Sequence, residues 1–380
     1  PEIDWKQAIV NKDNRVDSLV HGVNVLLERN KVDVFKGNAE FLNTNQIQID
    51  RNQIIESEKI IIATGSFPII PPVPGLDLPG ILTSNEALSL KELPDSMLIM
   101  GGGVIGVELG HLFNTLGVKI SIVEMEKRII SRFDKEITDV LHKTLIKQGI
   151  EICVSSKVVN VEAGFKVTIE TINGQVERQC DSVLVVAGRK PESYIAKQLG
   201  INTNKNAITV NEHYQTSIPH IYAIGDVTGK GMLAHSASHQ GMHAVDHALG
   251  LITLGRKQII PSCVYTTPEI ACVGKTEDEA RALSGNIKVG KFPFIASGRA
   301  TSSGNNTGFV KIIADEKYHQ ILGIHIIGTS ATELIGEATM AVELECTAKE
   351  ITNIIHAHPT MSEGIMEAAY QLLGKGIHYK

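Results

Sequence analysis

The fold of this chain is decided by residues 97–124, which read MLIMGGGVIGVELGHLFNTLGVKISIVE. An apolar run at residues 97–100 predicts a strand, and it leads directly into the glycines at residues 101–103. Apolar residues then recur at helical spacing up to Leu116, Gly117 ends the helix, and residues 120–123 predict a second strand. Two strands joined by one helix within about 30 residues predict a βαβ unit.

Further α/β structure is expected on both sides of this unit. Residues 32–62 read as short strands broken by turns, and five prolines between Pro68 and Pro79 predict an extended connection at a domain boundary. A second boundary is expected at residues 188–191, GRKP, where proline blocks continuation of a strand. The other expected elements are strands at 183–186, 221–224, 308–314 and 321–327 and helices at 234–249, 331–345 and 361–373.

Composition narrows the class of protein. The 380 residues are 43% hydrophobic and 21% charged, which is typical of a globular protein of two or three domains. A net charge of −6 without a basic run argues against a nucleic-acid partner, and no apolar stretch is long enough to span a membrane. The five cysteines form no CxxC or CxxxxC pair and no zinc-like cluster, so we expect ordinary thiols and no metal site.

The glycine run predicts a dinucleotide site in a Rossmann-type half-domain. Gly101 allows the sharp turn, Gly103 lets the backbone approach a pyrophosphate, and Gly106 permits close packing of helix on strand. Glu124, 23 residues after Gly101, ends the second strand, where a carboxylate accepts hydrogen bonds from a ribose 2′-hydroxyl and repels a 2′-phosphate. NAD is therefore expected rather than NADP. The alternative is that Glu124 only begins a solvated turn.

The same motif and several others resemble one enzyme family. GGGVIGVELG followed by Glu124 is similar to the NAD fingerprint of the pyridine nucleotide disulfide oxidoreductases, while IIIATGS at residues 60–66 and IYAIGDV at residues 221–227 resemble that family's FAD segments. MLAH at residues 232–235 and the later runs PSCVYTTPEIACVGKTEDEA and HAHPTMSE resemble its dihydrolipoamide dehydrogenase branch. The likeness spans the whole chain.

The resemblance implies two cofactors, FAD and NAD. Asp226 would accept a proton from a ribityl hydroxyl, and the start of the helix after residue 233 would face the flavin with its positive end. A simple helix-cap or turn role is the alternative for Asp226. The implied FAD contacts are Gly37, Thr64, Gly65, Ser66, Asp226, Met232, Leu233, Ala234 and His235. The implied NAD contacts are Gly101, Gly103, Val104, Ile105, Gly106, Glu108, Glu124, Val158 and Gly188.

His358 and Glu363 are the expected catalytic residues. A dithiol must lose a proton before its thiolate attacks a disulfide, and an imidazole with a pKa of about 6.5 is suited to hold that proton. The family motif runs from His through Pro to Glu, which selects His358, Pro359 and Glu363 and leaves His356 a structural role. Glu363 would fix the tautomer of His358. In the resembling family this pair reaches across a two-fold interface, so a homodimer is implied.

The chain also departs from the family pattern. A first GxGxxG for FAD and a CxxxxC disulfide are required there, and neither occurs in these 380 residues. We therefore expect a sequence trimmed at its N-terminus, whose parent enzyme is active and which is inactive as printed. Ser238, His239 and Gln240 stand where the family usually has acidic residues, and Glu192 stands where asparagine is common.

The resemblance implies an α/β fold with two Rossmann-like FAD/NAD(P)-binding domains, the first incomplete, and a C-terminal α+β dimerisation domain. The expected segments are 1–80 (part of the first FAD-binding segment), 81–192 (NAD-binding domain), 193–258 (returning FAD and central segment) and 259–380 (dimerisation domain). Partners would be a second copy and the lipoyl domains of 2-oxo acid dehydrogenase or glycine cleavage complexes. The expected location is the cytoplasm, or the mitochondrial matrix in a eukaryote.

Two other interpretations stay open. One is a related flavin disulfide reductase, such as a glutathione or mercury reductase, or a transhydrogenase. Glu124 argues against the NADP-linked members, and a transhydrogenase has no need of His358 and Glu363. The other is a non-catalytic, NAD-binding remnant that only dimerises. Flavin colour in the purified protein separates an FAD enzyme from such a remnant.

Overall fold

The computed structural model describes residues 3–252, 254–255 and 258–379. The chain divides into two compact units. Unit 1 comprises Pro1–Ile69, Asn85–Leu93 and Gly188–Lys257, and unit 2 comprises Ile70–Ser84, Pro94–Ala187 and Gln258–Lys380. The first division falls within the proline-rich stretch, after Ile69. The four-segment division expected from the sequence stays a prediction.

Unit 2 contains a five-stranded parallel sheet, with strand order β6-β13-β7-β8-β9. Its central strands are apolar almost throughout, as expected for a parallel sheet that is buried on both faces. Glycine at position 110 lets α3 lie close to this sheet, because a Cβ there would come within 3.2 Å of Ile99 and Ile122. The bounds are β6 Ile81–Leu82, β7 Ser96–Met100, α3 Val104–Thr115, β8 Lys119–Val123, α4 Lys135–Lys147, β9 Glu151–Cys153 and β13 Ser182–Val185.

An antiparallel three-stranded sheet is inserted between β9 and β13. It consists of β10 Lys157–Glu162, β11 Lys166–Thr171 and β12 Gly174–Gln179. Its inner side chains, including Val158, Val161 and Val167, pack with Leu98 and Val183 of the parallel sheet in one hydrophobic cluster. The insertion therefore shares its core with the βαβ unit.

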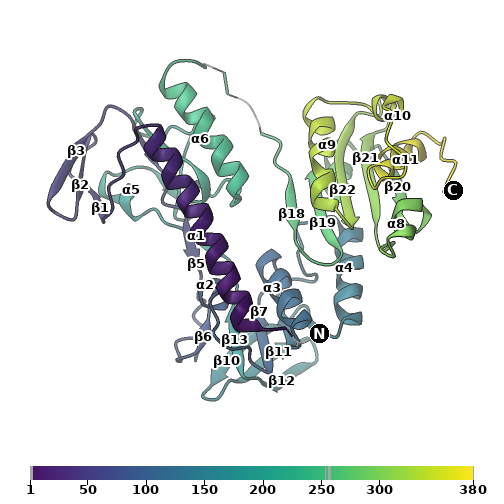
Figure 1. Cartoon of the computed structure of the whole chain (residues 1–380), viewed down its shortest axis with the longest axis horizontal. Coiled ribbons are helices and arrows are strands. Elements are labelled where there is room, and N and C mark those ends of the chain that lie inside the picture. Colours follow the sequence, from purple (N-terminus) through teal and green to yellow (C-terminus); the bar gives the residue numbers. More distant parts are fainter. Residues whose placement is uncertain (1–2, 253, 256–257, 380) are drawn as a thin grey trace. The chain divides into compact units, whose positions relative to one another are not determined.

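The C-terminal part of unit 2 is an antiparallel sheet with strand order β18-β19-β22-β21-β20. Helix α9 packs on β19 and β22, and α11 packs on β20 and β21, as Figure 1 shows at the C-terminal end of the chain. The helices and strands share one apolar core. The bounds are β18 Ser262–Val264, β19 Glu269–Gly274, α7 Glu277–Ser284, β20 Ile287–Pro293, η2 Phe294–Ala296, α8 Gly298–Ser302, β21 Phe309–Asp315, β22 Ile321–Gly328, α9 Ala331–Glu343, α10 Ala348–Asn353 and α11 Glu363–Leu372.

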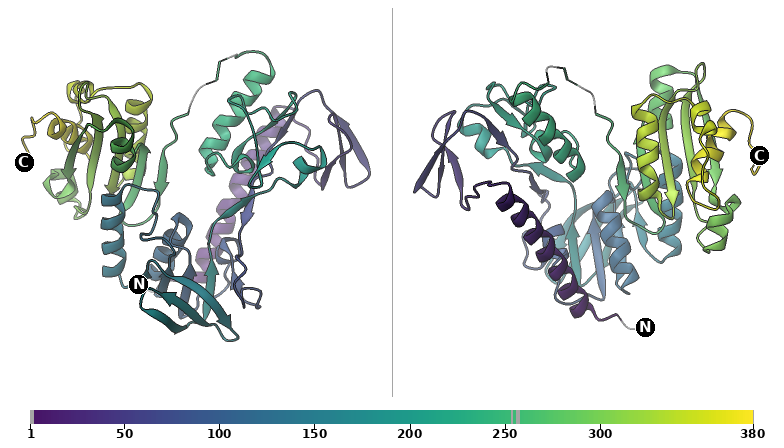
Figure 2. Two further views of the ribbon diagram at one scale, coloured as in Figure 1. Left: turned by 180° about the vertical axis from the view of Figure 1, so that it is seen from behind. Right: turned by 45° about the horizontal axis from the view of Figure 1, so that its top comes forward.

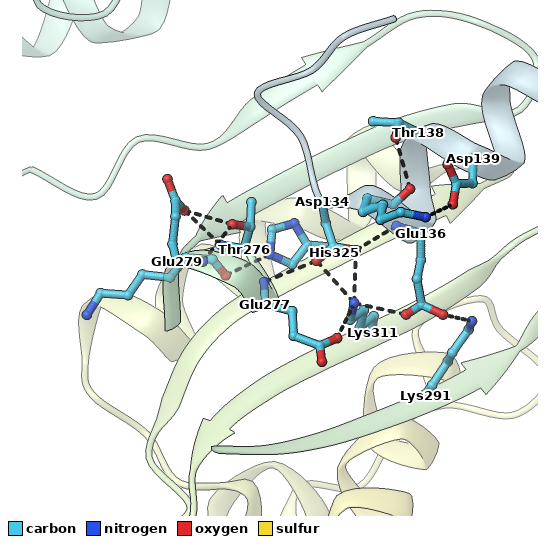
Figure 3. Close-up of polar contacts among 12 residues, drawn as sticks. Asp134, Glu136, Thr138, Asp139, Thr276, Glu277, Glu279, Lys291, Lys311 and His325 are labelled. Atoms are coloured by element: carbon cyan, nitrogen blue, oxygen red, sulfur yellow. Dashed lines mark hydrogen bonds and ion pairs between the residues drawn. The ribbon is translucent and has the colours of Figure 1, made fainter. Parts of the chain in front are cut away.

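A buried ion cluster ties α4 to this C-terminal sheet (Figure 3). The Lys311 ammonium, on β21, lies 2.9 Å from Asp134, 2.9 Å from Glu136 and 2.7 Å from Glu277. Asp134 also accepts hydrogen bonds from the backbone N–H groups of Glu136 and Glu277, so one carboxylate caps the starts of both α4 and α7. Lys311 is 1% exposed and Asp134 is 2% exposed. The cluster thus fixes the βαβ part of unit 2 on its antiparallel sheet.

Charge pairing outweighs desolvation in this cluster. Burial alone would raise the pKa of the Asp134 carboxyl, but the hydrogen bonds from Lys311 and the Glu277 backbone hold that pKa below its usual value. The pKa values of Glu136 and Glu277 are lowered in the same way. Burial would lower the pKa of Lys311, yet its three carboxylate partners raise it. All four groups are therefore charged at neutral pH.

Unit 1 is built from short strands and two long helices. Strand β4, Ile60–Ile62, pairs in parallel with β17, Ile221–Ala223, and β5, Ser66–Pro68, pairs antiparallel with β14, Arg189–Pro191. These pairings bring residues that are far apart in sequence into one core. The other bounds are β1 Ala39–Phe41, β2 Gln46–Ile49, β3 Gln53–Glu56, α5 Tyr194–Gln198, β15 Thr203–Asn204, β16 Ala207–Ile208, η1 Gly225–Thr228 and α6 Ala234–Ala248, and the short α2 spans Ser84–Ala87.

Helix α1, Trp5–Arg29, is the longest described helix, and the sequence patterns above predict neither it nor α4. It is drawn in purple in Figures 1 and 2. Asp4 caps its start by accepting a hydrogen bond from the Gln7 backbone N–H. None of its residues is buried, and apolar side chains such as Val16, Val20 and Val23 stay exposed. Their spacing of four and three residues is the signal that could have identified it.

The predicted fold class is confirmed, with small differences in element bounds. Helix α6 ends one residue before the expected end at residue 249, and α11 begins at Glu363 rather than at residue 361. Such shifts are expected because helix ends depend on capping. A larger difference lies at residues 189–191, where the GRKP segment forms an edge strand instead of only a break. Proline is tolerated there because β14 has one neighbour, β5.

Three histidines form a cluster in unit 1. The Nδ1 of His213 lies 3.2 Å from the Nε2 of His243, and the ring of His213 stacks on that of His247 with centroids 4.0 Å apart. The Tyr222 hydroxyl lies 2.9 Å from the Nδ1 of His247. Burial, and then repulsion from His213, lower the pKa values of His243 and His247. The other charged groups that act on these two rings are His239, Asp246, Glu212 and Lys59.

The histidine cluster should make unit 1 sensitive to mild acid. A lowered pKa in the fold means that protons bind more tightly to the unfolded chain, so stability is complete above about pH 6.5 and declines as the pH falls through the lowered values. Thermal unfolding measured from pH 8 to pH 5 should show a smaller loss in His247→Phe than in the wild type. His21→Phe, on the exposed face of α1, is the matched control and should behave as the wild type. Equal losses in all three proteins would contradict the prediction.

Candidate functional site

The glycine turn lies between β7 and α3 as its motif predicts. Gly101 has φ +119°, and a Cβ there would come within 2.5 Å of the Val186 carbonyl. A Cβ on Gly106 would lie 2.0 Å from the Gly101 carbonyl. Gly103 is the N-cap of α3 without a side-chain cap, and a Cβ there would meet nothing within 4 Å. The turn therefore offers unobstructed backbone and free helix amides, which suits a pyrophosphate.

Glu124 lies against this turn. Its carboxylate accepts hydrogen bonds from the backbone N–H of Gly102, at 2.6 Å, and of Glu126, at 2.7 Å. The first bond holds the carboxylate beside the glycine turn, and its remaining lone pairs suit a ribose hydroxyl. The bond from Glu126 is the contact expected of the alternative, in which Glu124 begins a turn, so the role of Glu124 toward NAD stays a prediction. The open glycine turn and the carboxylate beside it are both consistent with an NAD site.

The other residues expected to contact NAD are spread over unit 2 and its boundary. Val104 and Ile105 form the first turn of α3. The Glu108 carboxylate accepts the Tyr265 backbone N–H at 2.7 Å, and burial raises its pKa while that bond opposes the rise. Val158 is 3% exposed, so its side chain belongs to the core. Gly188 has φ +122° at the start of a unit 1 segment.

Several residues expected to contact FAD meet in unit 1. The Ser66 hydroxyl donates to the Asp226 carboxylate at 2.5 Å, and the Thr64 hydroxyl bonds to the Glu192 carbonyl at 2.5 Å. Arg189 donates to the hydroxyl and the carbonyl of Ser66, at 2.8 and 2.7 Å. The parallel pairing of β4 with β17 produces this arrangement, because their carboxyl ends lie at one edge.

The start of α6 carries the partial positive charge of a helix N-terminus. Leu233 is its N-cap and makes no side-chain cap bond, and the first turn, which begins with Ala234 and His235, holds no acidic residue. Its positive end is therefore uncompensated and suits a flavin edge that gains negative charge on reduction. Met232, just before it, is 38% exposed. Gly37 lies elsewhere, at the start of the β1-β2-β3 sheet, where Asp50 packs against it.

His358 and Glu363 form a close pair in the C-terminal sheet domain. The His358 Nδ1 lies 2.9 Å from the Glu363 carboxylate, whose second oxygen accepts the Thr360 backbone N–H at 2.8 Å. Burial alone would raise the pKa of Glu363, but these two bonds lower it, so the carboxylate is ionised. The His358 side chain is 78% exposed. The pair thus presents an oriented imidazole on the surface.

His356 has the structural role expected for it. Its Nε2 lies 2.8 Å from the Glu337 carboxylate, and its Nδ1 lies 3.1 Å from the Ile354 carbonyl. Its side chain is 4% exposed. Both ring nitrogens are thus occupied inside the domain.

The cysteines are ordinary thiols. All five are free, and burial raises the pKa values of four of them, Cys153, Cys180, Cys263 and Cys272. A raised pKa disfavours the thiolate that redox chemistry needs. These four cysteines therefore do not have the environment of a reactive thiol.

Two side chains of the site were missed at the sequence level. Arg189 belongs to GRKP, which was interpreted only as a break, although its guanidinium holds Ser66. Gln240 was noted only as a departure, although its amide bonds to the Gly225 backbone. Both contacts join segments that are distant in sequence, so no local pattern reveals them.

In the part of the chain that the structure describes, no group of three or more His, Cys, Asp or Glu side chains is arranged to hold a metal ion. Among the described helices, none combines the length and apolar composition that crossing a membrane requires.

Comparisons with known proteins agree with this geometry. Residues 2–241 match the family model for pyridine nucleotide-disulphide oxidoreductases, and residues 260–369 match the model of their dimerisation domain, which supports a homodimer. A dihydrolipoyl dehydrogenase of Bacillus subtilis (strain 168) is 39% identical, over 99% of this chain and 83% of its own length. The mitochondrial dihydrolipoyl dehydrogenase of Pisum sativum is 38% identical, over 99% of this chain and 78% of its own length.

A solved structure of a flavoprotein disulfide reductase has a similar fold. The HOCl-induced flavoprotein disulfide reductase RclA from Escherichia coli superposes with a TM-score of 0.88 at 30% identity, over 96% of this chain and 85% of that chain. The chain therefore belongs to the pyridine nucleotide-disulphide oxidoreductases, a family of oxidoreductases in which membership implies FAD and NAD(P) as cofactors.

Proposed function

We propose that the protein is a dihydrolipoyl dehydrogenase. Dihydrolipoamide and NAD⁺ would give lipoamide, NADH and a proton, so the two thiols lose two electrons and two protons. The observation that carries this proposal is the His358–Glu363 pair at 2.9 Å, which supplies an oriented base for a dithiol. The two dihydrolipoyl dehydrogenases above, at 38–39% identity, support the same substrate class.

The glycine turn would hold the pyrophosphate of NAD. Gly101 and Gly106 make the turn tight, Gly103 leaves room for the phosphates, and Glu124 would accept the ribose hydroxyls. Val104, Ile105, Glu108, Val158 and Gly188 would complete the site. The carboxylate of Glu124 would repel a 2′-phosphate, which makes NADP the weaker cofactor.

The Ser66–Asp226 contact and the start of α6 would hold FAD. Asp226 would accept a ribityl hydroxyl, Thr64 and Gly65 would lie along the same edge, and the positive end of α6, at Leu233, Ala234 and His235, would face the flavin. Gly37 and Met232 are the remaining proposed contacts. FAD held there would supply the two-electron chemistry that links a dithiol to NAD.

His358 would take the proton of the attacking thiol. Glu363 fixes the orientation of the ring through Nδ1, so Nε2 is the atom that would hold the proton. Because the side chain is largely exposed in one chain, we propose that it acts on a dithiol bound at the two-fold interface, where the cysteines of these 380 residues do not supply the disulfide that the family uses. The homodimer would then be required for turnover.

The proposed activity implies roles for the four segments, partner proteins and a location. The segments 1–80, 81–192, 193–258 and 259–380 would serve as FAD, NAD, central and dimerisation parts. Lipoyl domains of 2-oxo acid dehydrogenase or glycine cleavage complexes would be the partners, in the cytoplasm or in a mitochondrial matrix. A related disulfide reductase is the second candidate, favoured by the structural likeness to RclA.

Substrate and cofactor choice test the proposal. The holoenzyme should oxidise dihydrolipoamide with NAD and should show little turnover with NADP, because the Glu124 carboxylate beside the glycine turn would repel a 2′-phosphate. Stopped-flow or steady-state assays with lipoamide, glutathione disulfide and both nucleotides measure this directly. NADH and NADPH binding by calorimetry separates cofactor choice from chemistry. Preference for glutathione disulfide, or equal affinity for both nucleotides, would reject the proposal.

A further inference from the structure

Ile130 lies in the loop that joins β8 to α4, and its backbone conformation is unusual for its side chain. Its φ is +39°, and it is the only valine, isoleucine or threonine with a positive φ in the part of the chain that the structure describes. A side chain branched at Cβ crowds the backbone in this region, so the conformation costs energy that other contacts must offset. Such strain is typical of functional sites, where it places a group that the site needs.

The group that Ile130 places is its backbone N–H, which donates to the Gly102 carbonyl at 2.8 Å. This carbonyl belongs to the peptide unit between Gly102 and Gly103, inside the turn proposed for the pyrophosphate of NAD. In a planar trans peptide the carbonyl and the next N–H point in opposite directions. The bond therefore directs the Gly103 N–H away from the loop. Gly103 itself borders open space, since a Cβ there would meet nothing within 4 Å.

The peptide unit between Gly102 and Gly103 needs this bond, because its neighbours do not fix its orientation. The Gly102 N–H is held by Glu124 at 2.6 Å, and the Gly103 carbonyl accepts the Val107 N–H of α3 at 3.0 Å. These bonds hold the adjoining units, but a glycine at each end lets the unit between them turn over. Turned over, it would present the Gly102 carbonyl oxygen to the phosphates and repel them. The Ile130 N–H selects the opposite orientation.

The loop around Ile130 is held firmly against the glycine turn. The side chains of Ile129 and Ile130 are 0% and 4% exposed, and the Phe133 N–H closes a turn on the Ile130 carbonyl at 2.9 Å. A Cβ on Gly102 would come within 2.9 Å of Ile129, so the loop and the turn are in close contact. Burial of the two isoleucines offsets the strain at Ile130. The donor is thus in place before any ligand binds.

We propose that Ile130 is a positioning residue for NAD, whose backbone N–H holds the peptide unit between Gly102 and Gly103 in the orientation that offers an N–H to the pyrophosphate. This inference rests on the NAD site of the proposed function. The backbone group acts on the site, and the side chain only anchors the loop. A residue that keeps the N–H and the positive φ therefore keeps the function, and one that lacks both loses it.

The first experiment compares Ile130→Pro with Ile130→Gly in the holoenzyme. Proline has a φ of about −65° and no N–H, whereas glycine keeps the N–H and enters positive φ freely. The dissociation constant of NAD⁺, measured by calorimetry, should rise about tenfold or more for Ile130→Pro and less than about threefold for Ile130→Gly. Glycine removes the whole buried side chain, so it is the control for lost packing. Equal losses in both variants, or wild-type affinity in a folded Ile130→Pro protein, would overturn the inference.

Steady-state kinetics separate positioning from a general loss of structure. In Ile130→Pro the KM for NAD should rise with the dissociation constant, while kcat and the KM for dihydrolipoamide stay within about twofold of the wild type. A merely destabilised enzyme would lose kcat instead, because less of it is folded. A fall in kcat without a rise in the KM for NAD would therefore count against the assigned role.

A backbone substitution decides the case if Ile130→Pro does not fold. The α-hydroxy acid that corresponds to isoleucine, incorporated at position 130, replaces the N–H by an ester oxygen and keeps the side chain. NAD⁺ affinity should fall about tenfold, as for the lost bond in Ile130→Pro. Unchanged affinity would overturn the inference. Absence of NAD⁺ binding by the wild type would instead reject the proposed NAD site.

Discussion

Replacing His358 by glutamine in the holoenzyme should lower kcat for dihydrolipoamide oxidation by about 10²- to 10⁴-fold, the range typical of a lost general base. Glutamine keeps the length of the side chain but cannot hold the thiol proton. KM should change little, because the imidazole acts on the proton rather than on substrate binding. Glu363→Gln should lower kcat in the same direction, since it removes the charge that orients the ring.

Two controls make this result specific. His356→Gln removes a neighbouring histidine that is buried against Glu337, and it should affect stability more than kcat. Reduction of a dye by NADH, which draws electrons from the flavin without a thiol, should stay near the wild-type rate in His358→Gln. A His358→Gln enzyme with unchanged kcat, or with equal losses in both assays, would exclude the assigned role.

Replacing Lys311 by methionine should cost about 3–5 kcal/mol of unfolding free energy, the range expected when one partner of a buried ion pair is removed. The methionine fills similar space, but it leaves Asp134, which is 2% exposed, facing Glu136 and Glu277 without a cation. Chemical denaturation at pH 7 measures the loss. Lys291→Met is the matched control, because that side chain is 39% exposed and makes an ion pair with Glu136 beside the Phe309 ring, so its loss should be about 1 kcal/mol.

The pH dependence of the Lys311→Met effect has a definite sign. In the wild type the lowered pKa values of Asp134, Glu136 and Glu277 contribute stability above about pH 4, and that stability is lost as the pH falls through them. Without Lys311 the carboxyls protonate more easily. The difference between the wild type and Lys311→Met should therefore shrink toward pH 4. A difference in unfolding free energy that is constant with pH, or no larger than that of Lys291→Met, would contradict the stabilising role assigned to the ion cluster.

Local sequence determined the parts of the fold that have a short-range cause. The glycine turn was predictable because its three glycines stand at a fixed spacing within one βαβ unit. A side chain at Gly101 or Gly106 would collide with the backbone, and one at Gly103 would occupy the space proposed for the ligand. Helix α6 and the C-terminal strands followed from periodicity, whereas the His358–Glu363 pair was predicted from the resemblance to a family motif, and the structure places the two side chains 2.9 Å apart. Helix α1 carried a helical signal too, with Val16, Val20 and Val23 on one face.

Only the tertiary structure decided the contacts between distant segments. Asp134 and Lys311 are 177 residues apart, and Ser66 and Asp226 are 160 residues apart, yet each pair is in direct contact. The sequence predicted that Glu124 contacts the cofactor, but only the fold placed its carboxylate against the Gly102 N–H. The reason is physical: periodicity and turn chemistry act over a few residues, whereas the partner of a buried charge is set by which strands pair and which helices pack on them.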